Sequence, residues 1–210
     1  MKIKRDKRAL YISILSLILF LAITFFVATN AFVINFDSYL NLNIRNVATS
    51  FLDRVAELIT NIGDTVTIVI LAVLFAVFLA YRKKLYQSGF VLSSVAGGAV
   101  LVYIFKILIQ RDRPANMVIS ESGYGFPSGH AVSSLIFFSL LIYLYKDKIK
   151  NIVLKNLFVC ANVLLILLMG LTRIYLRVHW FSDVIGGYLL GLFWIGMMFW
   201  AFGKSKLIIK

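Results

Sequence analysis

The sequence is poor in cysteine and proline. It has one cysteine, Cys160, and two prolines, Pro114 and Pro127, among 210 residues. A single cysteine excludes a disulfide within the chain and a metal site built from several cysteines. Because Cys160 lies inside an apolar run, we expect it to be a small buried side chain rather than a reactive thiol.

Charged residues are missing from six long stretches of the chain. The sequence is 61% hydrophobic, whereas soluble domains are roughly 45–50% apolar. A membrane helix needs about 20 mostly apolar residues, with a range of roughly 17–25. We therefore predict an all-α fold, a bundle of six transmembrane helices, in which residues 1–210 form one integral-membrane domain. The six stretches without Asp, Glu, Lys or Arg are residues 9–36, 65–81, 85–105, 122–145, 156–172 and 184–203.

The first stretch follows several basic residues, as the apolar part of a signal peptide does. Its apolar core is longer than about 7–15 residues, and no clear small-residue cleavage site follows it. We therefore expect a retained helix that ends near Val33. The next segment, 35–64, has apolar residues at roughly helical spacing, which predicts one or two short amphipathic helices on the outer membrane surface. A solvated loop with some apolar residues is the alternative.

Acidic residues are also few, nine against 22 basic ones, which gives a formal net charge of +13. Such a charge is typical of nucleic-acid-binding proteins, but here it follows the topology. On the six-helix topology, 15 basic residues lie on the side of the two termini and seven on the other side. The positive-inside rule then places both termini in the cytoplasm of a plasma-membrane protein. We expect no nucleic-acid partner, and the sequence indicates no obligate protein partner.

Three polar clusters lie at the outer ends of the predicted helices. They are KILIQRDRP at 106–114, PSGH at 127–130 and TRIYLRVHWFSD at 172–183. Both histidines of the chain, His130 and His179, belong to these clusters. Polar and ionisable groups at membrane depth are costly, so their gathering at one boundary predicts a functional site.

The PSGH cluster has the chemistry of an anion site. Proline is favoured in a first helical turn, and the serine and glycine leave backbone N–H groups approachable. A helix N-terminus of this kind attracts phosphate through these groups and its dipole. Lys106, Arg113 and Arg173 would add three cations, two of them with guanidinium forks that match phosphate oxygens. Taken singly, the lysine is typical of an interfacial side chain and the arginines of head-group anchors.

The histidines have the chemistry of a nucleophile and an acid. His179 and Asp183 are four residues apart and share one face of a helix. A carboxylate beside one ring nitrogen fixes the tautomer and leaves the other nitrogen free to attack. Because its unperturbed pKa is near 6.5, His130 is suited to act as a general acid. A metal site is disfavoured, because two histidines and one aspartate would bind it beside three cations.

Taken together, the three clusters resemble the motifs of the type 2 phosphatidic acid phosphatase superfamily, KxxxxxxRP, PSGH and SRxxxxxHxxxD. The order and the spacings match from Lys106 to Asp183, and the six helices extend the resemblance over most of the chain. Thr172 stands where the family usually has serine. Since both carry a hydroxyl, we expect the exchange Thr172→Ser to be nearly silent.

The resemblance implies a metal-independent lipid phosphatase without a cofactor. His179 would attack phosphorus to form a phosphohistidine, Asp183 would orient it, and His130 would protonate the leaving oxygen and then activate water. The phosphate-holding groups would be Lys106, Arg113, Ser128, Gly129 and Arg173. The implied substrate is a membrane lipid phosphate or diphosphate at the outer face, either phosphatidylglycerophosphate, undecaprenyl diphosphate or phosphatidic acid. An anionic-lipid transporter or scramblase is the alternative function.

Three aromatic residues, Tyr124, Phe126 and Trp180, lie near the predicted site. Aromatic rings are enriched at membrane interfaces, so these three are placed to line an entrance for lipid. An ordinary aromatic belt is an equal alternative.

Overall fold

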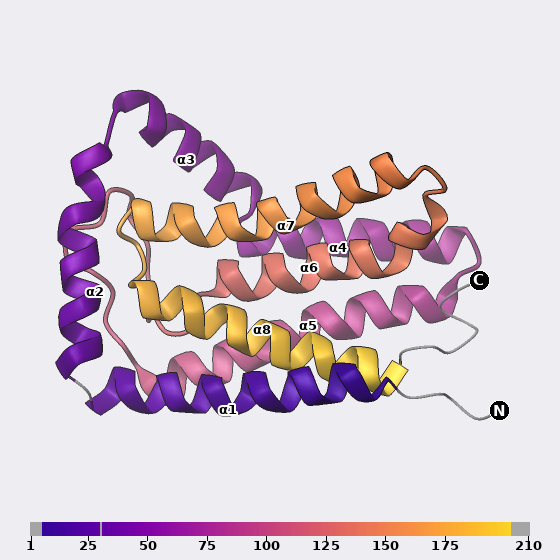
Figure 1. Ribbon diagram of the computed structural model, residues 1–210, viewed down its shortest axis with the longest axis horizontal. Helices are drawn as coiled ribbons and strands as arrows, with labels where there is room; N and C mark the ends of the chain where they lie inside the picture. Colours follow the sequence, from indigo (N-terminus) through magenta and orange to yellow (C-terminus); the bar gives the residue numbers. More distant parts are fainter. Residues whose placement is uncertain (1–5, 30, 203–210) are drawn as a thin grey trace.

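The computed structural model describes residues 6–29 and 31–202, and these residues are arranged in helices and connecting loops (Figure 1). Two short 3₁₀ helices, η1 (Ile44–Val47) and η2 (Lys146–Lys148), continue α2 and α6. The α-helices of the described residues are α1 Lys7–Thr29, α2 Ala31–Asn43, α3 Ser50–Ile62, α4 Thr65–Tyr81, α5 Leu85–Ile109, α6 Gly129–Tyr145, α7 Ile152–Tyr175 and α8 Phe181–Phe202.

The lengths and composition of these helices fit a multi-pass membrane protein. Five described segments are long and apolar enough to cross a membrane, namely α1, α5, α6 with η2, α7 and α8. The pair α3 and α4 also passes when taken together, with a bend of 44° between them. The predicted all-α membrane bundle is confirmed. The six predicted spans compare with five such segments, or with six when the bent pair counts as one span.

The first apolar stretch forms two helices rather than one. The predicted end near Val33 is wrong, because α1 ends at Thr29 and α2 begins at Ala31. Figure 1 shows α2 running across one end of the bundle instead of continuing along α1. This turn brings Asp37 of α2 to Arg111, with which it forms an ion pair of 2.7 Å. The predicted short helices of segment 35–64 are thus α2 and α3.

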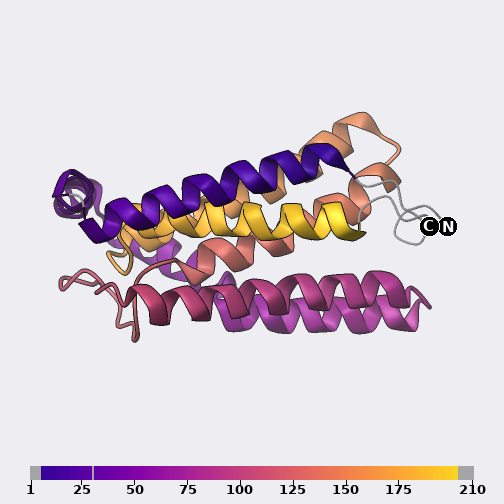
Figure 2. The same cartoon turned by 90° about the horizontal axis from the view of Figure 1, so that it is seen from below.

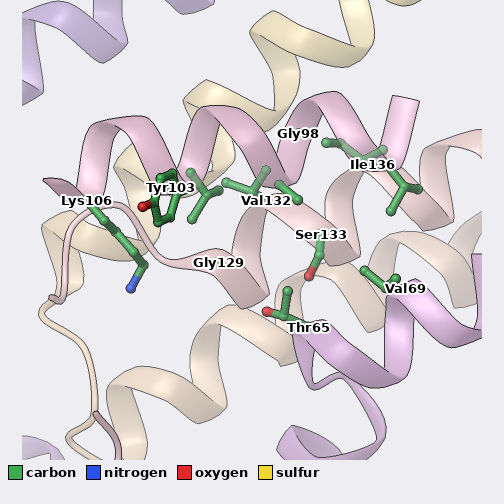
Figure 3. Close-up of a pocket in the computed structure, with 12 residues that line it drawn as sticks. Thr65, Val69, Gly98, Tyr103, Lys106, Gly129, Val132, Ser133 and Ile136 are labelled. Carbon is green, nitrogen blue, oxygen red and sulfur yellow. The ribbon is translucent and has the colours of Figure 1, made fainter. Parts of the chain in front are cut away.

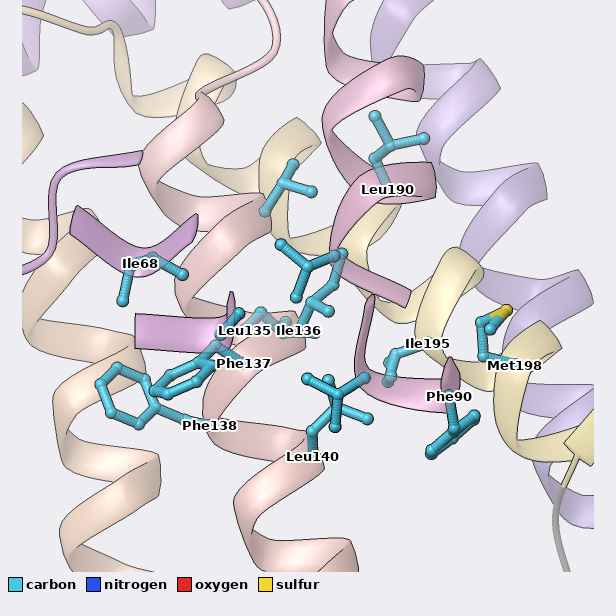
Figure 4. Packing of buried hydrophobic residues seen from close by; sticks show 14 of the residues in the cluster. Ile68, Phe90, Leu135, Ile136, Phe137, Phe138, Leu140, Leu190, Ile195 and Met198 are labelled. Carbon is cyan, nitrogen blue, oxygen red and sulfur yellow. The ribbon is translucent and has the colours of Figure 1, made fainter. Parts of the chain in front are cut away.

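Helix α6 lies at the centre of the bundle. In Figure 2, α4 and α5 run side by side below it, and α1 lies along α8 above it. Figure 4 shows the apolar side chains that meet there from α4, α5, α6 and α8. Since lipid is as apolar as these side chains, close van der Waals packing holds the helices together rather than removal from water.

Cys160 does not lie in this core. It is an exposed free cysteine on α7, so the expectation of a buried side chain is wrong. An exposed position on a membrane-spanning helix is as apolar in its surroundings as a buried one, and the sequence pattern does not separate the two.

Glycines let α8 approach α6, as small residues do in membrane helices. A Cβ added at Gly187 would lie 2.7 Å from the Ser128 carbonyl oxygen and 2.9 Å from the Ala131 Cβ. A Cβ at Gly191 would lie 3.2 Å from Leu135 Cδ2. Two small residues four apart in an apolar helix, as Gly187 and Gly191 are, predict a packing face, and these contacts confirm it.

We expect Gly187→Ala to destabilise the protein by about 1–3 kcal/mol, the usual cost of overpacking. The new methyl group would meet a backbone oxygen, which moves only if the start of α6 moves. The measurement is the free energy of unfolding in detergent. Gly89→Ala on α5 is the matched control, because a Cβ there meets nothing within 4 Å. Equal stability of the two variants would contradict the packing role.

Candidate active site

The three polar clusters of the sequence come together at one end of the bundle. Lys106 lies in the last turn of α5, and Arg173 lies in the last turn of α7. The PSGH cluster surrounds the start of α6, and His179 lies just before α8. Asp183 lies in the first turn of α8. The loop 110–128 passes over this end and carries Arg113.

His179 and Asp183 form a buried pair. Nδ1 of His179 lies 3.3 Å from Oδ2 of Asp183. On the other side of the ring, Nη1 of Arg113 lies 3.1 Å from Nε2 of His179. An arginine donates hydrogen bonds and accepts none, so Nε2 is the acceptor and Nδ1 carries the proton toward the carboxylate. The lone pair of Nε2 therefore points to Arg113. Together with Arg173 and Lys106, the other cations near His179, Arg113 forms what we call the cation cluster.

The surroundings keep His179 neutral. Burial lowers its pKa well below 6.5, and the charges of Arg113, Arg173 and Lys106 lower the pKa further. A neutral imidazole is the form in which a ring nitrogen can act as nucleophile.

This pKa makes stability depend on pH. A histidine with a depressed pKa in the folded state takes up its proton more readily when unfolded, so its contribution is complete above pH 6.5 and is lost as the pH falls below it. We expect the free energy of unfolding to fall by about 1.4 kcal/mol per pH unit below pH 6.5 through His179. The measurement compares the wild type with His179→Ala in denaturant titrations at several pH values. An identical pH slope in both proteins would contradict the buried neutral histidine.

Asp183 is held by more than the histidine. Its Oδ2 accepts a hydrogen bond from the backbone N–H of Trp180 at 3.0 Å. Its Oδ1 accepts one from Arg111 Nη1 at 2.6 Å, and the same guanidinium bonds Asp37 at 2.7 Å. Asp37 in turn accepts the backbone N–H and the hydroxyl of Ser182. Arg111 and Asp37 were missed at the sequence level, because Asp37 lies in no motif and Arg111 occupies a variable position of its motif.

The start of α6 offers buried donors. The backbone N–H of Ser128 donates to the carbonyl oxygen of Asp183 at 3.0 Å, which joins α6 to α8. Ser128 Oγ and Arg173 Nε are buried and have no hydrogen-bond partner within the described residues. Buried polar atoms are normally paired, so these two groups are suited to donate hydrogen bonds to an anion. Pro127 precedes α6 rather than lying in its first turn, which corrects the expectation for that residue.

An acidic residue of the loop, Glu121, lies among the phosphate-binding candidates. Its Oε1 pairs with Arg173 Nη2, and its Oε2 lies 3.8 Å from Arg113 Nη2. The other terminal nitrogen of Arg173 donates to Thr60 Oγ1 of α3 at 2.7 Å. Burial lowers the pKa of Arg113, while the charge of Glu121 raises it. Nothing in the sequence pointed to Glu121 or Thr60, because both lie outside the motifs.

His130 and Lys106 also have partners from elsewhere in the chain. Nε2 of His130 lies 3.3 Å from Oδ1 of Asp64, the residue that caps α4. Lys106 Nζ donates to the carbonyl oxygen of Tyr124. His179, Arg173, Arg113 and Lys106 all lie close enough to His130 to interact with it electrostatically. The structure therefore brings the predicted acid and the predicted nucleophile into one site.

An apolar cavity of about 220 Å³ adjoins the site between α4, α5 and α6. Figure 3 shows Lys106 at one end of it and Ile136 at the other, with Gly129 between them. Most of its other lining side chains are aliphatic, among them Val69 and Val132. A hydrocarbon chain fits such a lining, with the charged groups at its end.

The three aromatic residues near the site differ in their surroundings. Phe126 is fully buried and its ring stacks on that of Phe20 with centroids 5.8 Å apart, so the expectation that it lies at the interface is wrong. Tyr124 is partly exposed. Trp180 donates to the carbonyl oxygen of Asp112 at 2.9 Å and lies under the guanidinium of Arg111. Through these two contacts Trp180 holds the loop 110–128 close to the start of α8.

The donors of this site suit an anion. Across residues 6–29 and 31–202, no three His, Cys, Asp or Glu side chains gather as a metal centre would require. Lysine, arginine, serine and a helix N-terminus converge instead, and these are the groups with which proteins bind phosphate.

Comparisons with known proteins agree with this chemistry. The family model described as the PAP2 superfamily matches residues 87–207, which contain all three clusters. Phosphatidylglycerophosphatase B of Bacillus subtilis (strain 168) is 28% identical over 149 residues, which are 68% of this chain and 71% of the relative. The crystal structure of a transmembrane PAP2 type phosphatidylglycerolphosphate phosphatase from Bacillus subtilis is similar with a TM-score of 0.80 and 25% identity. That similarity covers 90% of this chain and 94% of the solved one.

Proposed function

Since this chain belongs to the PAP2 superfamily, we propose that it removes the terminal phosphate from a membrane lipid phosphate through a phosphohistidine. It is a multi-pass membrane protein and a lipid phosphatase. Phosphatidylglycerophosphate is the first candidate substrate, because the name of the Bacillus subtilis relative specifies it. Undecaprenyl diphosphate and phosphatidic acid remain the other candidates.

The first step uses the lone pair of His179 Nε2. It attacks phosphorus, a P–N bond forms, and the bond between phosphorus and the oxygen of the lipid breaks. His130 delivers a proton to that leaving oxygen. The proton on Nδ1 stays in its hydrogen bond to Asp183, which stabilises the positive charge that develops on the ring. The tautomer fixed by Arg113 and Asp183 is the observation that carries this proposal.

The second step releases inorganic phosphate. Water attacks the phosphohistidine, His130 takes a proton from that water, and the P–N bond breaks. Throughout both steps the phosphate oxygens need donors that are in place before the charge develops. The unpaired Arg173 Nε and Ser128 Oγ supply two such donors. The further donors in this proposal are Lys106, Arg113 and the backbone of Gly129.

The position of the site supports a substrate whose tail stays in the bilayer. The apolar cavity runs from Lys106 and Gly129 to Ile136, between α4, α5 and α6. The excess of basic residues at the opposite end supports cytoplasmic termini and a site at the outer face. A transporter or scramblase, the alternative from the sequence, would usually hold its site near the bilayer midplane, whereas these groups gather at one end.

The test is phosphate release by the purified protein in detergent with EDTA present. Phosphatidylglycerophosphate, undecaprenyl diphosphate and phosphatidic acid are compared as substrates at equal surface concentration. We expect release from at least one of them, with the highest kcat/KM for phosphatidylglycerophosphate. Folded protein that releases phosphate from none of the three would overturn the proposal, and release only after addition of a divalent metal would overturn the metal-independent mechanism.

Under this proposal, Glu121 competes with the substrate for Arg173 and Arg113. We expect Glu121→Gln to lower both KM and the inhibition constant of inorganic phosphate about 5–30-fold, because removal of a like charge beside an anion contributes about 1–2 kcal/mol. The measurement is product inhibition by inorganic phosphate. Glu57→Gln on α3 is the control with the same change of charge. A weaker phosphate affinity in Glu121→Gln would show that the carboxylate organises the arginines instead.

A further inference from the structure

A second cavity lies at the opposite end of the bundle from the candidate active site. It has a volume of about 190 Å³ and is formed where α4 ends, α5 begins and α6 runs into η2. Along α6, whose 17 residues rise 1.5 Å each, the two sites are about 25 Å apart. We call this cavity the basic pocket, and its lining residues are Phe78, Leu79, Arg82, Lys84, Tyr145 and Lys148.

Three of the lining residues of the basic pocket are cations, and none of its described lining residues is acidic. The side chains of Lys84 and Lys148 are within interaction distance of each other. Two like charges so placed repel each other, and the repulsion is stronger where water is partly excluded. The carboxylate beside them in sequence, Asp147, forms an ion pair of 2.7 Å with Lys155 instead.

The backbone holds these cations in place. The turn from α4 to α5 is closed by hydrogen bonds from the N–H of Lys84 to the Leu79 carbonyl oxygen and from the N–H of Lys83 to the Ala80 carbonyl oxygen, both 2.8 Å long. Lys83 has a φ of 58°, in the left-handed region. On the other side of the pocket, Lys148 Nζ lies 4.6 Å from the centre of the Tyr145 ring, a cation–π contact. The turn from α4 to α5 and the Tyr145 ring therefore keep the like charges of Lys84 and Lys148 close together.

We propose that the basic pocket binds the phosphate group of an anionic phospholipid from the leaflet at this end of the bundle. An anion between the three cations removes their repulsion and takes several charge-assisted hydrogen bonds. A lipid fits better than a free ion because Phe78 and Leu79 at the end of α4 make part of the wall apolar. Basic groups just beyond membrane spans are the groups that attract anionic head groups.

This site is separate from the proposed hydrolysis. It shares no residue with the candidate active site, and its ligand is bound without reaction. A lipid held at the junction of α4, α5 and α6 would stabilise the three helices that also enclose the apolar cavity near Lys106.

The experiment measures the melting temperature in nanodiscs of phosphatidylcholine alone and of an equal mixture of phosphatidylcholine and phosphatidylglycerol. The pocket variant is Arg82→Gln with Lys84→Gln and Lys148→Gln. The matched control is Lys83→Gln with Lys146→Gln and Lys150→Gln, which removes the same charge from the same end of the protein outside the pocket lining. A third arm adds inorganic phosphate to phosphatidylcholine nanodiscs.

We expect phosphatidylglycerol to raise the melting temperature of the wild type and of the control by roughly 3–6 °C, the shift from a ligand at about tenfold its Kd in a chain of this size. The pocket variant should lose this shift. Equal shifts in the pocket and control variants would overturn the proposal in favour of general surface attraction. A full shift with inorganic phosphate alone would overturn the lipid as the ligand.

If the triple pocket variant fails to fold, two further measurements test the proposal. The single variant Lys148→Gln changes an exposed side chain and should show a reduced shift. Native mass spectrometry of the wild type should show phosphatidylglycerol retained in preference to phosphatidylcholine, and equal retention of both lipids would overturn the proposal.

Discussion

His179→Ala is expected to lower kcat for phosphate release by at least about 10⁴-fold, which is typical for loss of a nucleophile. The substitution removes the Nε2 atom that faces the cation cluster. The fold should persist, because Asp183 keeps its hydrogen bonds from Trp180 and Arg111. The measurements are the steady-state rate with the best lipid substrate and the melting temperature at pH 7.5 in the same detergent.

Trapping the intermediate would separate the nucleophile from a merely structural histidine. A phosphohistidine is labile to acid and stable to base, so brief reaction with a labelled substrate and a basic quench should retain label on the wild type. With an aryl phosphate, whose leaving group needs no proton, His130→Ala should accumulate this label because its second step is slowed. Retention of activity in His179→Ala, or label on that variant, would overturn the assignment.

Arg111→Gln is expected to lower the free energy of unfolding by about 3–5 kcal/mol, the usual effect of removing one partner from a buried ion pair. The substitution leaves the carboxylates of Asp37 and Asp183 without their shared cation, and both are almost completely buried. Activity should also fall, because Asp183 would no longer hold His179 in one orientation. The measurements are denaturant unfolding and kcat of the variant.

The control for Arg111 is the exposed ion pair between Arg45 and Asp53. Its side chains are 22% and 33% exposed, so Arg45→Gln should cost about 0–1 kcal/mol. The double variant Arg111→Gln with Asp37→Asn should recover part of the stability lost in the single one, because it removes one of the two unpaired charges. An effect of Arg111→Gln no larger than that of Arg45→Gln would show that water reaches the buried carboxylates.

The sequence located the groups at the centre of the candidate site because their spacing is local. The four-residue interval keeps His179 and Asp183 within reach of each other, although His179 lies just before α8 and not on the helix face that the spacing predicts. The PSGH motif marks the start of α6. The further partners of these groups could not be predicted, because the tertiary fold alone brings them to the site. Asp64 and Glu121 reach the site from a helix cap and a loop, whose positions are set by how the helices pack.

The break between α1 and α2 shows a second limit of the sequence. Composition does not separate a continuous span from a helix that turns, because both faces of a membrane helix are apolar. Asp37 was the one signal, since an acidic residue so soon after a span needs a partner. That partner, Arg111, lies 74 residues away in sequence, and no spacing rule connects the two.

The exposed position of Cys160 gives the protein a single site for labelling with thiol-reactive probes. It is the only thiol of the chain, and it lies on α7, the helix whose far end carries Arg173. A fluorophore or spin label with an apolar linker will therefore attach at one known point without a cysteine-free background being engineered first. Spectroscopy from that point can follow α7 during turnover while every group of the candidate site stays native.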